Sequence, residues 1–311
     1  MSGPLVLFAA KPEAWAAYRE PLGRALAEAV PAARLVTEAP PEAVDYAVLA
    51  PNGPIADFAP FARLKAALNL WAGVEEALLI PNLRAPLARM VDPGLTQGMV
   101  EWVSGHVLRH HLGMDAHIVN PDAAWRPEPP PLASRRRVGV LGLGELGGAC
   151  AAALASLGFD VAGWSRTPRA VEGVATHHGE AGLDAVLGRS EILVLLLPLT
   201  PATESLIDAR RLARLPPGAV LLNPGRGGLV EDDALLAALD DGRLAHATLD
   251  TFREEPLPRD HPFWSHPRVT VTPHIASATR PETASRAVAE NVRRGEAGEP
   301  FLHLVDRVRG Y

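Results

Sequence analysis

Three strand-like segments in the last third of the sequence each end in a side chain that could do chemistry. The segments "NPGRGG", "LDTFREEP" and "TPHIAS" contain Arg226, Asp250 with Glu255, and His274. Arginine binds a carboxylate through two parallel hydrogen bonds and keeps its proton, whereas histidine can release and regain one near neutral pH. A carbonyl group that is being reduced develops negative charge on its oxygen, so a cation and a proton donor must already be in place. Because ligands bind at the carboxyl ends of parallel strands, we expect these residues to converge on one site.

A glycine-rich turn precedes these segments. In "VGVLGLGELGGACAAALASLG" the glycines fall at Gly142, Gly144 and Gly147, directly after a strand and at the start of an alanine-rich helix. In a dinucleotide-binding turn the first glycine makes the tight bend, the second lets the backbone approach the pyrophosphate, and the third permits close packing of helix on strand. The free N–H groups at the helix N-terminus then face the phosphates. The turn therefore predicts a dinucleotide cofactor.

The end of the next strand indicates which dinucleotide binds. An NAD site expects an acidic residue about twenty positions after the first glycine, where it bonds the ribose 2′-hydroxyl. Here the strand "DVAGWSRTPR" ends in Ser165, Arg166 and Thr167, and Asp160 lies at its other end. Arginine can bind a 2′-phosphate, with the two hydroxyls as further donors. The sequence favours NADP and leaves NAD possible; in the alternative interpretation Arg166 and Arg169 are solvated loop charges.

Composition excludes several classes of protein. Of the 311 residues 48% are hydrophobic and 21% are charged, which are globular values, and no apolar run approaches the eighteen or so residues of a membrane span. Cys150 is the only cysteine, so neither an internal disulfide nor a multi-cysteine metal site can form, and we expect no metal. The net charge is −6 and no basic run occurs, which argues against nucleic acid as a partner. The N-terminus has no basic leader, so we expect no signal peptide and a reducing, cytoplasmic location.

Two series of strands and helices must position the candidate residues. From Met1 to about Asp92, short apolar runs alternate with helical patterns, which favours a small parallel α/β unit. A long helix is expected over Gly98–Met114, followed by a proline-rich passage. A second and more regular series begins at Val138, and its continuous apolar runs indicate strands buried on both faces.

The predicted fold class is α/β, with two Rossmann-like domains, each built on a doubly wound parallel sheet, and an active site in the cleft between the domains. We expect residues 1–98 together with 281–311 to form a discontinuous substrate-binding domain. Residues 99–280 are expected to form the dinucleotide-binding domain.

The order of the motifs resembles a known family. "GLGELG", "LLPLTPAT", "NPGRGGLVEDDAL", "LDTFREEPLP" and "VTPHIAS" are similar to the D-isomer-specific 2-hydroxyacid dehydrogenases across nearly all of the second domain. "LWAGVEEAL" resembles the substrate loop of the family, and the ending "VDRVRGY" resembles its glyoxylate/hydroxypyruvate reductase A subgroup. Together with the strand end at Arg166, which favours NADP, the resemblance implies an NADPH-preferring reductase that converts glyoxylate and hydroxypyruvate to glycolate and D-glycerate.

The resemblance also implies roles for individual residues. Arg226 would bind the carboxylate and carbonyl oxygen of a 2-oxo acid. His274 would be the general acid, and Glu255, which precedes Pro256, would hydrogen-bond its imidazole; Glu254 is the competing carboxylate. Asp250 would lie near the nicotinamide carboxamide.

Further positions follow from the same motifs. Trp71, Ala72 and Gly73 would contact the substrate, the last two through their backbone N–H groups. The remaining cofactor contacts would come from the glycine turn and the loops after later strands: Glu145, Leu146, Leu197, Pro198, Thr203, Pro224 and Gly225. The partners implied are a small 2-oxo acid and, as a homodimer, a second copy of the chain, with no membrane.

Two other functions remain open at this point. Some transcriptional corepressors share the fold and the arginine, glutamate and histidine, so a dinucleotide-sensing binding protein is one alternative. A related dehydrogenase that acts on phosphoglycerate, formate or phosphite is the other. Trp71 stands where relatives often carry a small residue, which leaves the size of the preferred substrate open.

Four side chains receive structural rather than chemical interpretations. We expect His110 and His111 to be solvated residues of a helix. Cys150 and Trp102 are expected to be buried.

Overall fold

The computed structural model describes residues 3–50 and 52–311 and divides the chain into two compact units. Unit 1 comprises Met1–Leu95 and Ala278–Tyr311, and unit 2 comprises Thr96–Ser277. Met1, Ser2 and Pro51, which belong to the predicted first domain, lie outside the described residues.

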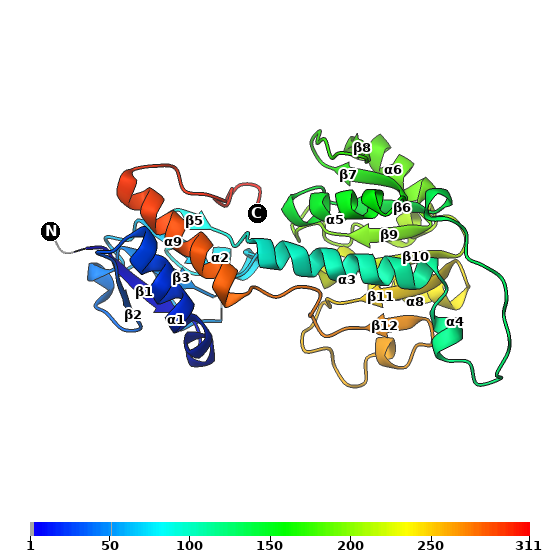
Figure 1. Ribbon diagram of the computed structural model, residues 1–311, viewed down its shortest axis with the longest axis horizontal. Helices are drawn as coiled ribbons and strands as arrows, with labels where there is room; N and C mark the ends of the chain where they lie inside the picture. Colours follow the sequence, from blue (N-terminus) through cyan, green and yellow to red (C-terminus); the bar gives the residue numbers. More distant parts are fainter. Residues whose placement is uncertain (1–2, 51) are drawn as a thin grey trace. The chain divides into compact units, whose positions relative to one another are not determined.

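Unit 1 is built on a five-stranded parallel sheet in the order β2-β1-β3-β4-β5 (Figure 1). The first strand, "LVLFA", is buried along its whole length, as expected for a parallel strand covered on both faces. The strands are β1 (Leu5–Ala9), β2 (Arg34–Val36), β3 (Tyr46–Leu49), β4 (Ala66–Asn69) and β5 (Leu87–Ala88). The helices are α1 (Pro12–Ala29), α2 (Glu75–Leu79) and α9 (Pro281–Ala297).

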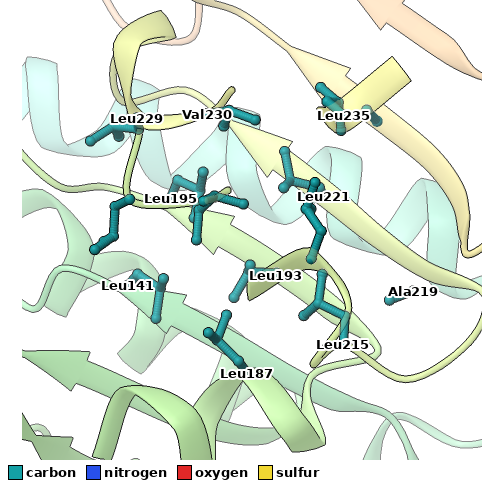
Figure 2. Close-up of a cluster of buried hydrophobic side chains, with 14 of the residues drawn as sticks. Leu141, Leu187, Leu193, Leu195, Leu215, Ala219, Leu221, Leu229, Val230 and Leu235 are labelled. Atoms are coloured by element: carbon teal, nitrogen blue, oxygen red, sulfur yellow. The ribbon is translucent and has the colours of Figure 1, made fainter. Parts of the chain in front are cut away.

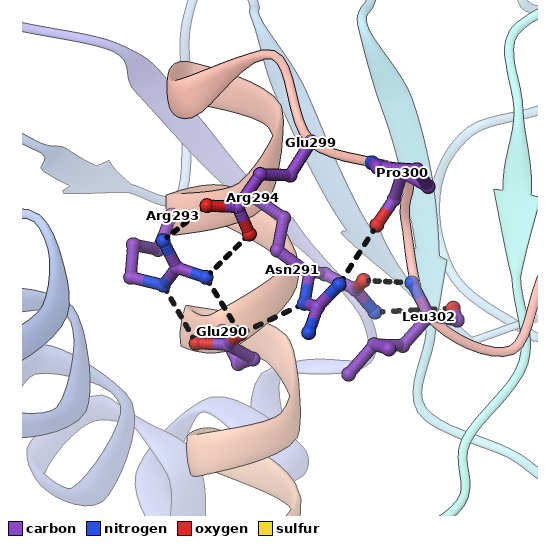
Figure 3. A network of polar contacts seen from close by, with 7 residues as sticks. All are labelled: Glu290, Asn291, Arg293, Arg294, Glu299, Pro300 and Leu302. Carbon is purple, nitrogen blue, oxygen red and sulfur yellow. Dashed lines mark hydrogen bonds and ion pairs between the residues drawn. The ribbon is translucent and has the colours of Figure 1, made fainter.

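The C-terminal helix α9 completes unit 1. It packs beside α1 over one face of the sheet, and Ala284, Val288 and Val292 recur at the four-residue spacing that keeps one helix face buried (Figure 1). A polar network near the C-terminal end of α9, in which Arg293 binds both Glu290 and Glu299, connects the helix to the segment that follows it (Figure 3).

Unit 2 is built on a seven-stranded parallel sheet in the order β12-β11-β10-β9-β6-β7-β8. The strand order reverses between β6 and β9, which is the position where doubly wound sheets bind ligands. The strands are β6 (Arg137–Leu141), β7 (Asp160–Ser165), β8 (Ala175–His178), β9 (Ile192–Leu195), β10 (Ala219–Asn223), β11 (Leu244–Leu249) and β12 (Val269–Val271). The helices are α3 (Pro93–His111, from Thr96 onward in this unit), α4 (Asp115–Ile118), α5 (Glu145–Ser156), α6 (Gly179–Arg189), α7 (Ala209–Leu212) and α8 (Asp232–Asp240).

Helices cover both faces of this sheet. On one face, side chains of α6, α7 and α8 pack on alternate strand residues such as Leu193, Leu195 and Leu221, so that a layer of leucines fills the core (Figure 2). On the other face α3 and α5 cover Val194 and Leu222. The predicted α/β class with two parallel sheets is therefore confirmed.

The expectation that His110 and His111 are solvated is wrong. His111 is 6% exposed, and its ring meets the edge of the Phe159 ring with 5.0 Å between centroids. His110 is half-buried; its Nε2 lies 2.9 Å from the Thr248 hydroxyl, and its ring lies 5.0 Å from that of His246. Both histidines belong to the face of α3 that packs on the sheet. Imidazole is small enough to fill such a position while it is neutral.

Cys150 and Trp102 were predicted to be buried; Cys150 is fully buried and Trp102 is half-buried. Cys150 is 0% exposed, and burial raises the pKa of its thiol to about 12, so the thiol stays protonated. Trp102 is half-buried and its ring lies 4.4 Å from that of His106. Within residues 3–50 and 52–311 no helix is both long and apolar enough to cross a membrane.

Candidate active site

The three glycines of the turn after β6 have three different environments. Gly142 has φ +102°, a backbone conformation that side chains with a Cβ rarely adopt. A Cβ on Gly147 would lie 1.8 Å from the Gly142 carbonyl oxygen, so only glycine lets α5 approach the strand this closely. A Cβ on Gly144 would meet nothing within 4 Å. Glycine at position 144 is therefore not required by the folded chain itself.

The open space at Gly144 fits the diphosphate of a dinucleotide. Gly144 is the N-cap of α5, and a glycine has no side chain with which to cap the helix. The first N–H groups of a helix have no partner within it and carry partial positive charge, which suits an anion. Glu145 and Leu146 occupy the first turn, so their backbone N–H groups lie at this end.

The end of β7 carries the groups predicted to distinguish NADP from NAD. Ser165 is the last strand residue and Arg166, which follows it, is exposed. The Ser165 hydroxyl donates to the Thr167 carbonyl at 2.8 Å, so it fixes the bend that carries Arg166. Asp160, at the other end of the strand, forms an ion pair with Arg189. The strand end thus presents a cation and no carboxylate.

The loop after β9 is held rigid by Thr203. Its hydroxyl donates to the Pro198 carbonyl at 2.7 Å and accepts from the Thr200 N–H at 2.8 Å. Leu197, the other predicted cofactor contact of this loop, is 8% exposed. The loop follows β9, so it lies at the reversal point of the sheet beside the glycine turn.

Arg226 lies in a turn that Asn223 organises from within. Asn223 ends β10 and is 1% exposed; its Nδ2 donates to the Arg226 carbonyl at 2.8 Å, and its Oδ1 accepts from the Gly225 N–H at 3.2 Å. Pro224 and Gly225 are buried between them. One guanidinium N–H of Arg226 donates to the Gly225 carbonyl at 2.7 Å, and this contact restricts the orientation of the half-buried guanidinium group.

His274 and Glu255 form a hydrogen-bonded pair. The His274 Nδ1 lies 2.7 Å from Glu255 Oε2, and Glu255 Oε1 accepts from the Phe252 N–H at 2.9 Å. Because a carboxylate only accepts, Nδ1 carries a proton, and Nε2 is the atom that can exchange one with a ligand. The structure brings Glu255 rather than Glu254 to the histidine.

Hydrogen bonds link the ends of three neighbouring strands that carry these residues. The Asp250 N–H donates to the Asn223 carbonyl at 3.1 Å, and the His274 N–H donates to the Asp250 carbonyl at 2.8 Å. A Cβ on Gly227 would lie 2.0 Å from the carbonyl carbon of Phe252, so the Arg226 turn also packs directly on the segment that leads to Glu255. The arginine, glutamate and histidine turns therefore share one end of the sheet.

The predicted substrate loop belongs to unit 1 and is held in the same manner. Asn69 ends β4, is 1% exposed, and donates through Nδ2 to the carbonyls of Trp71 and Gly73, both at 2.9 Å. Trp71 is exposed and Ala72 is half-buried.

Sequence reasoning missed Asn69, Asn223 and Thr272, a threonine whose hydroxyl bonds the Asp250 carboxylate. All three stand at or next to the end of a strand that precedes a predicted functional turn. A polar residue closing an otherwise apolar strand was the available signal. In the part of the chain that the structure describes, no group of three or more His, Cys, Asp or Glu side chains is arranged to hold a metal ion.

A doubly wound sheet with this glycine turn, an arginine turn and a histidine–carboxylate pair is the arrangement of a dinucleotide-dependent dehydrogenase. Residues 106–276 match the family described as D-isomer specific 2-hydroxyacid dehydrogenase, NAD binding domain. The chain belongs to this family.

Relatives and solved structures agree with that assignment. Glyoxylate/hydroxypyruvate reductase A of Yersinia enterocolitica is 41% identical over 258 residues, which cover 80% of this chain and 82% of the relative. A D-isomer specific 2-hydroxyacid dehydrogenase of Xanthobacter autotrophicus Py2, solved with NADPH and MES, superposes over 100% of both chains with a TM-score of 0.91 and 44% identity. An NADPH-dependent glyoxylate/hydroxypyruvate reductase of Sinorhizobium meliloti, solved with NADP and sulfate, covers 99% of this chain and all of its own, with a TM-score of 0.88 and 37% identity.

Proposed function

We propose that the protein is an NADPH-preferring reductase of small 2-oxo acids, which converts glyoxylate to glycolate and hydroxypyruvate to D-glycerate. The observation that carries the proposal is the His274 Nδ1–Glu255 Oε2 contact of 2.7 Å at the sheet end that also carries Arg226. That pair leaves Nε2 available to give a proton, and Arg226 supplies a cation that suits a carboxylate. Relatives named as glyoxylate/hydroxypyruvate reductases support the choice of substrates.

In this proposal the groups have separate tasks. Arg226 binds the carboxylate of the 2-oxo acid and polarises its carbonyl oxygen. His274 donates the proton from Nε2 to that oxygen, and Glu255 holds the imidazole so that Nε2 faces the substrate. The bound cofactor supplies the hydride that reaches the carbonyl carbon. The hydrogen-bonded Arg226 and His274 turns would hold the cation and the acid in place before the charge develops, which is how such groups lower a barrier.

The cofactor would lie across the carboxyl ends of β6, β7 and β9. We propose that the N–H groups at Gly144, Glu145 and Leu146 bind the pyrophosphate, with Gly142 and Gly147 maintaining the turn. Arg166 would bind the 2′-phosphate, beside Ser165 and Thr167. The loops that contain Leu197, Pro198 and Thr203, and Pro224 and Gly225, would contact the nicotinamide half. Solved relatives that contain NADPH or NADP support this cofactor.

We propose that unit 1 contributes substrate contacts and unit 2 binds the dinucleotide. The Trp71–Gly73 loop would grip the substrate carboxylate through the N–H groups of Ala72 and Gly73. Asn69 fixes the direction of two carbonyls of that loop, and because carbonyl and N–H groups alternate along a chain, it also fixes the N–H groups between them. A Trp71→Ala variant should widen the range of 2-oxo acids that are reduced.

A homodimer is the assembly that the family resemblance implies. The segment from Leu112 to Leu132 in unit 2, which includes the long loop after α4 (Figure 1), carries six exposed large apolar side chains, and Trp125 among them is 92% exposed. Exposed large apolar side chains in this number within one segment favour a contact surface, and we propose that a second copy covers them. Sedimentation should give a dimer, and Ile118→Asp should give a monomer.

We also propose a cytoplasmic location, which the single, buried cysteine supports.

The experiment that tests the function is a steady-state panel. Glyoxylate, hydroxypyruvate, pyruvate and bulkier 2-oxo acids are assayed with NADPH and with NADH, and phosphoglycerate, formate and phosphite are assayed in the oxidising direction with NADP. The proposal predicts the highest kcat/KM for glyoxylate or hydroxypyruvate with NADPH. The matched control is His274→Ala, which should lose roughly a hundredfold or more in kcat and still bind NADPH. NADPH binding without turnover of any acid would indicate a sensing protein instead.

A further inference from the structure

His178 ends the edge strand β8, beside the strand end that is proposed to bind the 2′-phosphate. In the register of the parallel pair β7 and β8, His178 is the partner of Ser165. Neighbouring strands lie about 4.8 Å apart, and register partners point to the same face of a sheet. The imidazole of His178 therefore leaves the sheet on the same side as the Ser165 hydroxyl, one strand away.

The segment that begins with Arg166 crosses this same face. After Ser165 the chain returns to the start of β8, and on the way Val171 packs with side chains of α5 against the sheet. Trp164, which precedes Ser165 in β7, points to the opposite face and packs with side chains of α6. The Ser165 hydroxyl, the segment after it and the His178 imidazole thus share the α5 side of the sheet.

The His178 side chain is available to a ligand. It is exposed, does not cap the start of α6, and has no hydrogen-bond or ion-pair partner among the residues that the structure describes. Glu180, the nearest carboxylate along the chain, is paired with Arg211, whose Nη2 lies 2.8 Å from Glu180 Oε1. An imidazole donates a hydrogen bond in its neutral form and is a cation when both ring nitrogens are protonated. The position therefore suits a phosphate oxygen.

We propose that His178 is a second ligand of the adenosine 2′-phosphate, beside Arg166. The inference rests on the proposed function in one respect, the placement of NADP with its ribose at the end of β7. A 2′-phosphate bound by Ser165 and Arg166 would lie next to the end of β8, within the length of a histidine side chain. The added donor would strengthen the binding of NADPH and leave NADH, which has a hydroxyl group there, unaffected.

The test compares two fragments of the cofactor, 2′,5′-ADP and 5′-AMP, by isothermal titration calorimetry. They differ only in the 2′-phosphate and contain no nicotinamide, so their binding is independent of turnover. We expect His178→Ala to weaken 2′,5′-ADP about three- to tenfold, as for the loss of one hydrogen bond, and to leave 5′-AMP within twofold. His178→Gln, which keeps an N–H donor, should bind 2′,5′-ADP more tightly than His178→Ala. His178→Glu, which adds a negative charge, should bind it at least tenfold more weakly than the parent.

The matched control is His177→Ala, the neighbouring histidine on the other face. His177 is the register partner of Trp164, and a Cβ on Gly182 of α6 would lie 3.1 Å from the His177 Cβ. His177 therefore packs on α6, and its loss should lower stability while both fragments bind within twofold of the parent.

Two results would overturn the role of His178. Equal losses of 2′,5′-ADP and 5′-AMP in His178→Ala would assign the side chain to the adenosine or to the fold. Unchanged 2′,5′-ADP affinity in that variant, with a loss in Arg166→Ala, would keep the placement of the cofactor and exclude the histidine. A parent protein that binds both fragments equally would contradict the proposed placement itself. A parent that reduces no 2-oxo acid would contradict only the proposed reaction, because the titrations do not depend on turnover.

Discussion

Replacing Gly144 by alanine separates the needs of the cofactor from the needs of the fold. Gly144 has φ −73°, which alanine adopts without strain, and a Cβ there would meet nothing within 4 Å. Gly147 gives the opposite case, because its Cβ would lie 1.8 Å from the Gly142 carbonyl oxygen. Two substitutions of the same kind, three residues apart, should therefore have different effects.

The magnitudes follow from these environments. At an N-cap, alanine is less favourable than glycine by a few tenths of a kcal/mol to about 1 kcal/mol. The loss of backbone freedom in the unfolded chain offsets this by about 0.4–1 kcal/mol. Gly144→Ala should thus leave stability within about 1 kcal/mol, or about 2 °C in Tm. Gly147→Ala forces the helix or the turn to move and should cost about 1–3 kcal/mol.

Gly144→Ala should have a large effect on cofactor affinity, in contrast to its small effect on stability. The added methyl at position 144 occupies the space assigned to the pyrophosphate, so NADPH should bind at least tenfold more weakly, a loss of about 1.4 kcal/mol. Thermal unfolding without cofactor measures the first effect, and a fluorescence titration with NADPH measures the second. A Gly144→Ala protein that is stable and binds NADPH as the parent does would refute the placement of the dinucleotide at this turn.

Three further outcomes are expected. Arg166→Ala should weaken NADPH ten- to a hundredfold and leave NADH unchanged, since a charge-assisted contact contributes about 1.5–3 kcal/mol; equal losses for both cofactors would contradict its contact with the 2′-phosphate. Arg226→Lys should raise the KM for glyoxylate at least tenfold, because an ammonium group cannot reproduce the two parallel hydrogen bonds, and an unchanged KM points to another anchor. Burial, together with the neighbouring His246, lowers the pKa of His110 to about 3, and burial lowers that of His246 to about 4, so the unfolded chain binds more protons below the ordinary value of 6.5. Stability is therefore full above about pH 6.5 and falls as the pH drops toward 4, by at most about 1.4 kcal/mol per histidine and pH unit; Tm measured across that range should fall less steeply in His246→Gln.

The fold was predictable because its strands are apolar on both faces. A run such as "ILVLLL" can only be buried. The glycines after β6 were also interpretable from their spacing, since Gly142 adopts a positive φ and Gly147 lets the helix approach the strand closely. The edge strand β8, "ATHH", was not predicted, because an edge strand needs neither apolar residues nor alternation. The burial of His111 was missed for a related reason: a polar residue type was taken as a sign of exposure.

The supporting contacts of the candidate site could not be predicted in the same way, although the residue types at the strand ends were visible in the sequence. Asn69, Asn223 and Asp250 act through hydrogen bonds to backbone groups of the turns that follow. Those contacts depend on how each turn bends back over the strand end, and neither periodicity nor motif spacing contains that information. The residue types were sufficient to predict the chemistry of the site. The geometry of the turns was needed to find the neighbouring residues that hold the catalytic side chains in place.

The central claim is hydride transfer from NADPH to the carbonyl carbon of a 2-oxo acid. Its most direct test uses NADPH that carries deuterium at the transferable position of the nicotinamide, with hydroxypyruvate as the acceptor. Mass spectrometry and chiral chromatography of the product should show D-glycerate with one deuterium at C2, formed by the parent protein and at a rate at least a hundredfold lower by His274→Ala. Glycerate without deuterium at C2, glycerate of the L configuration, or no glycerate from the parent protein would contradict the account.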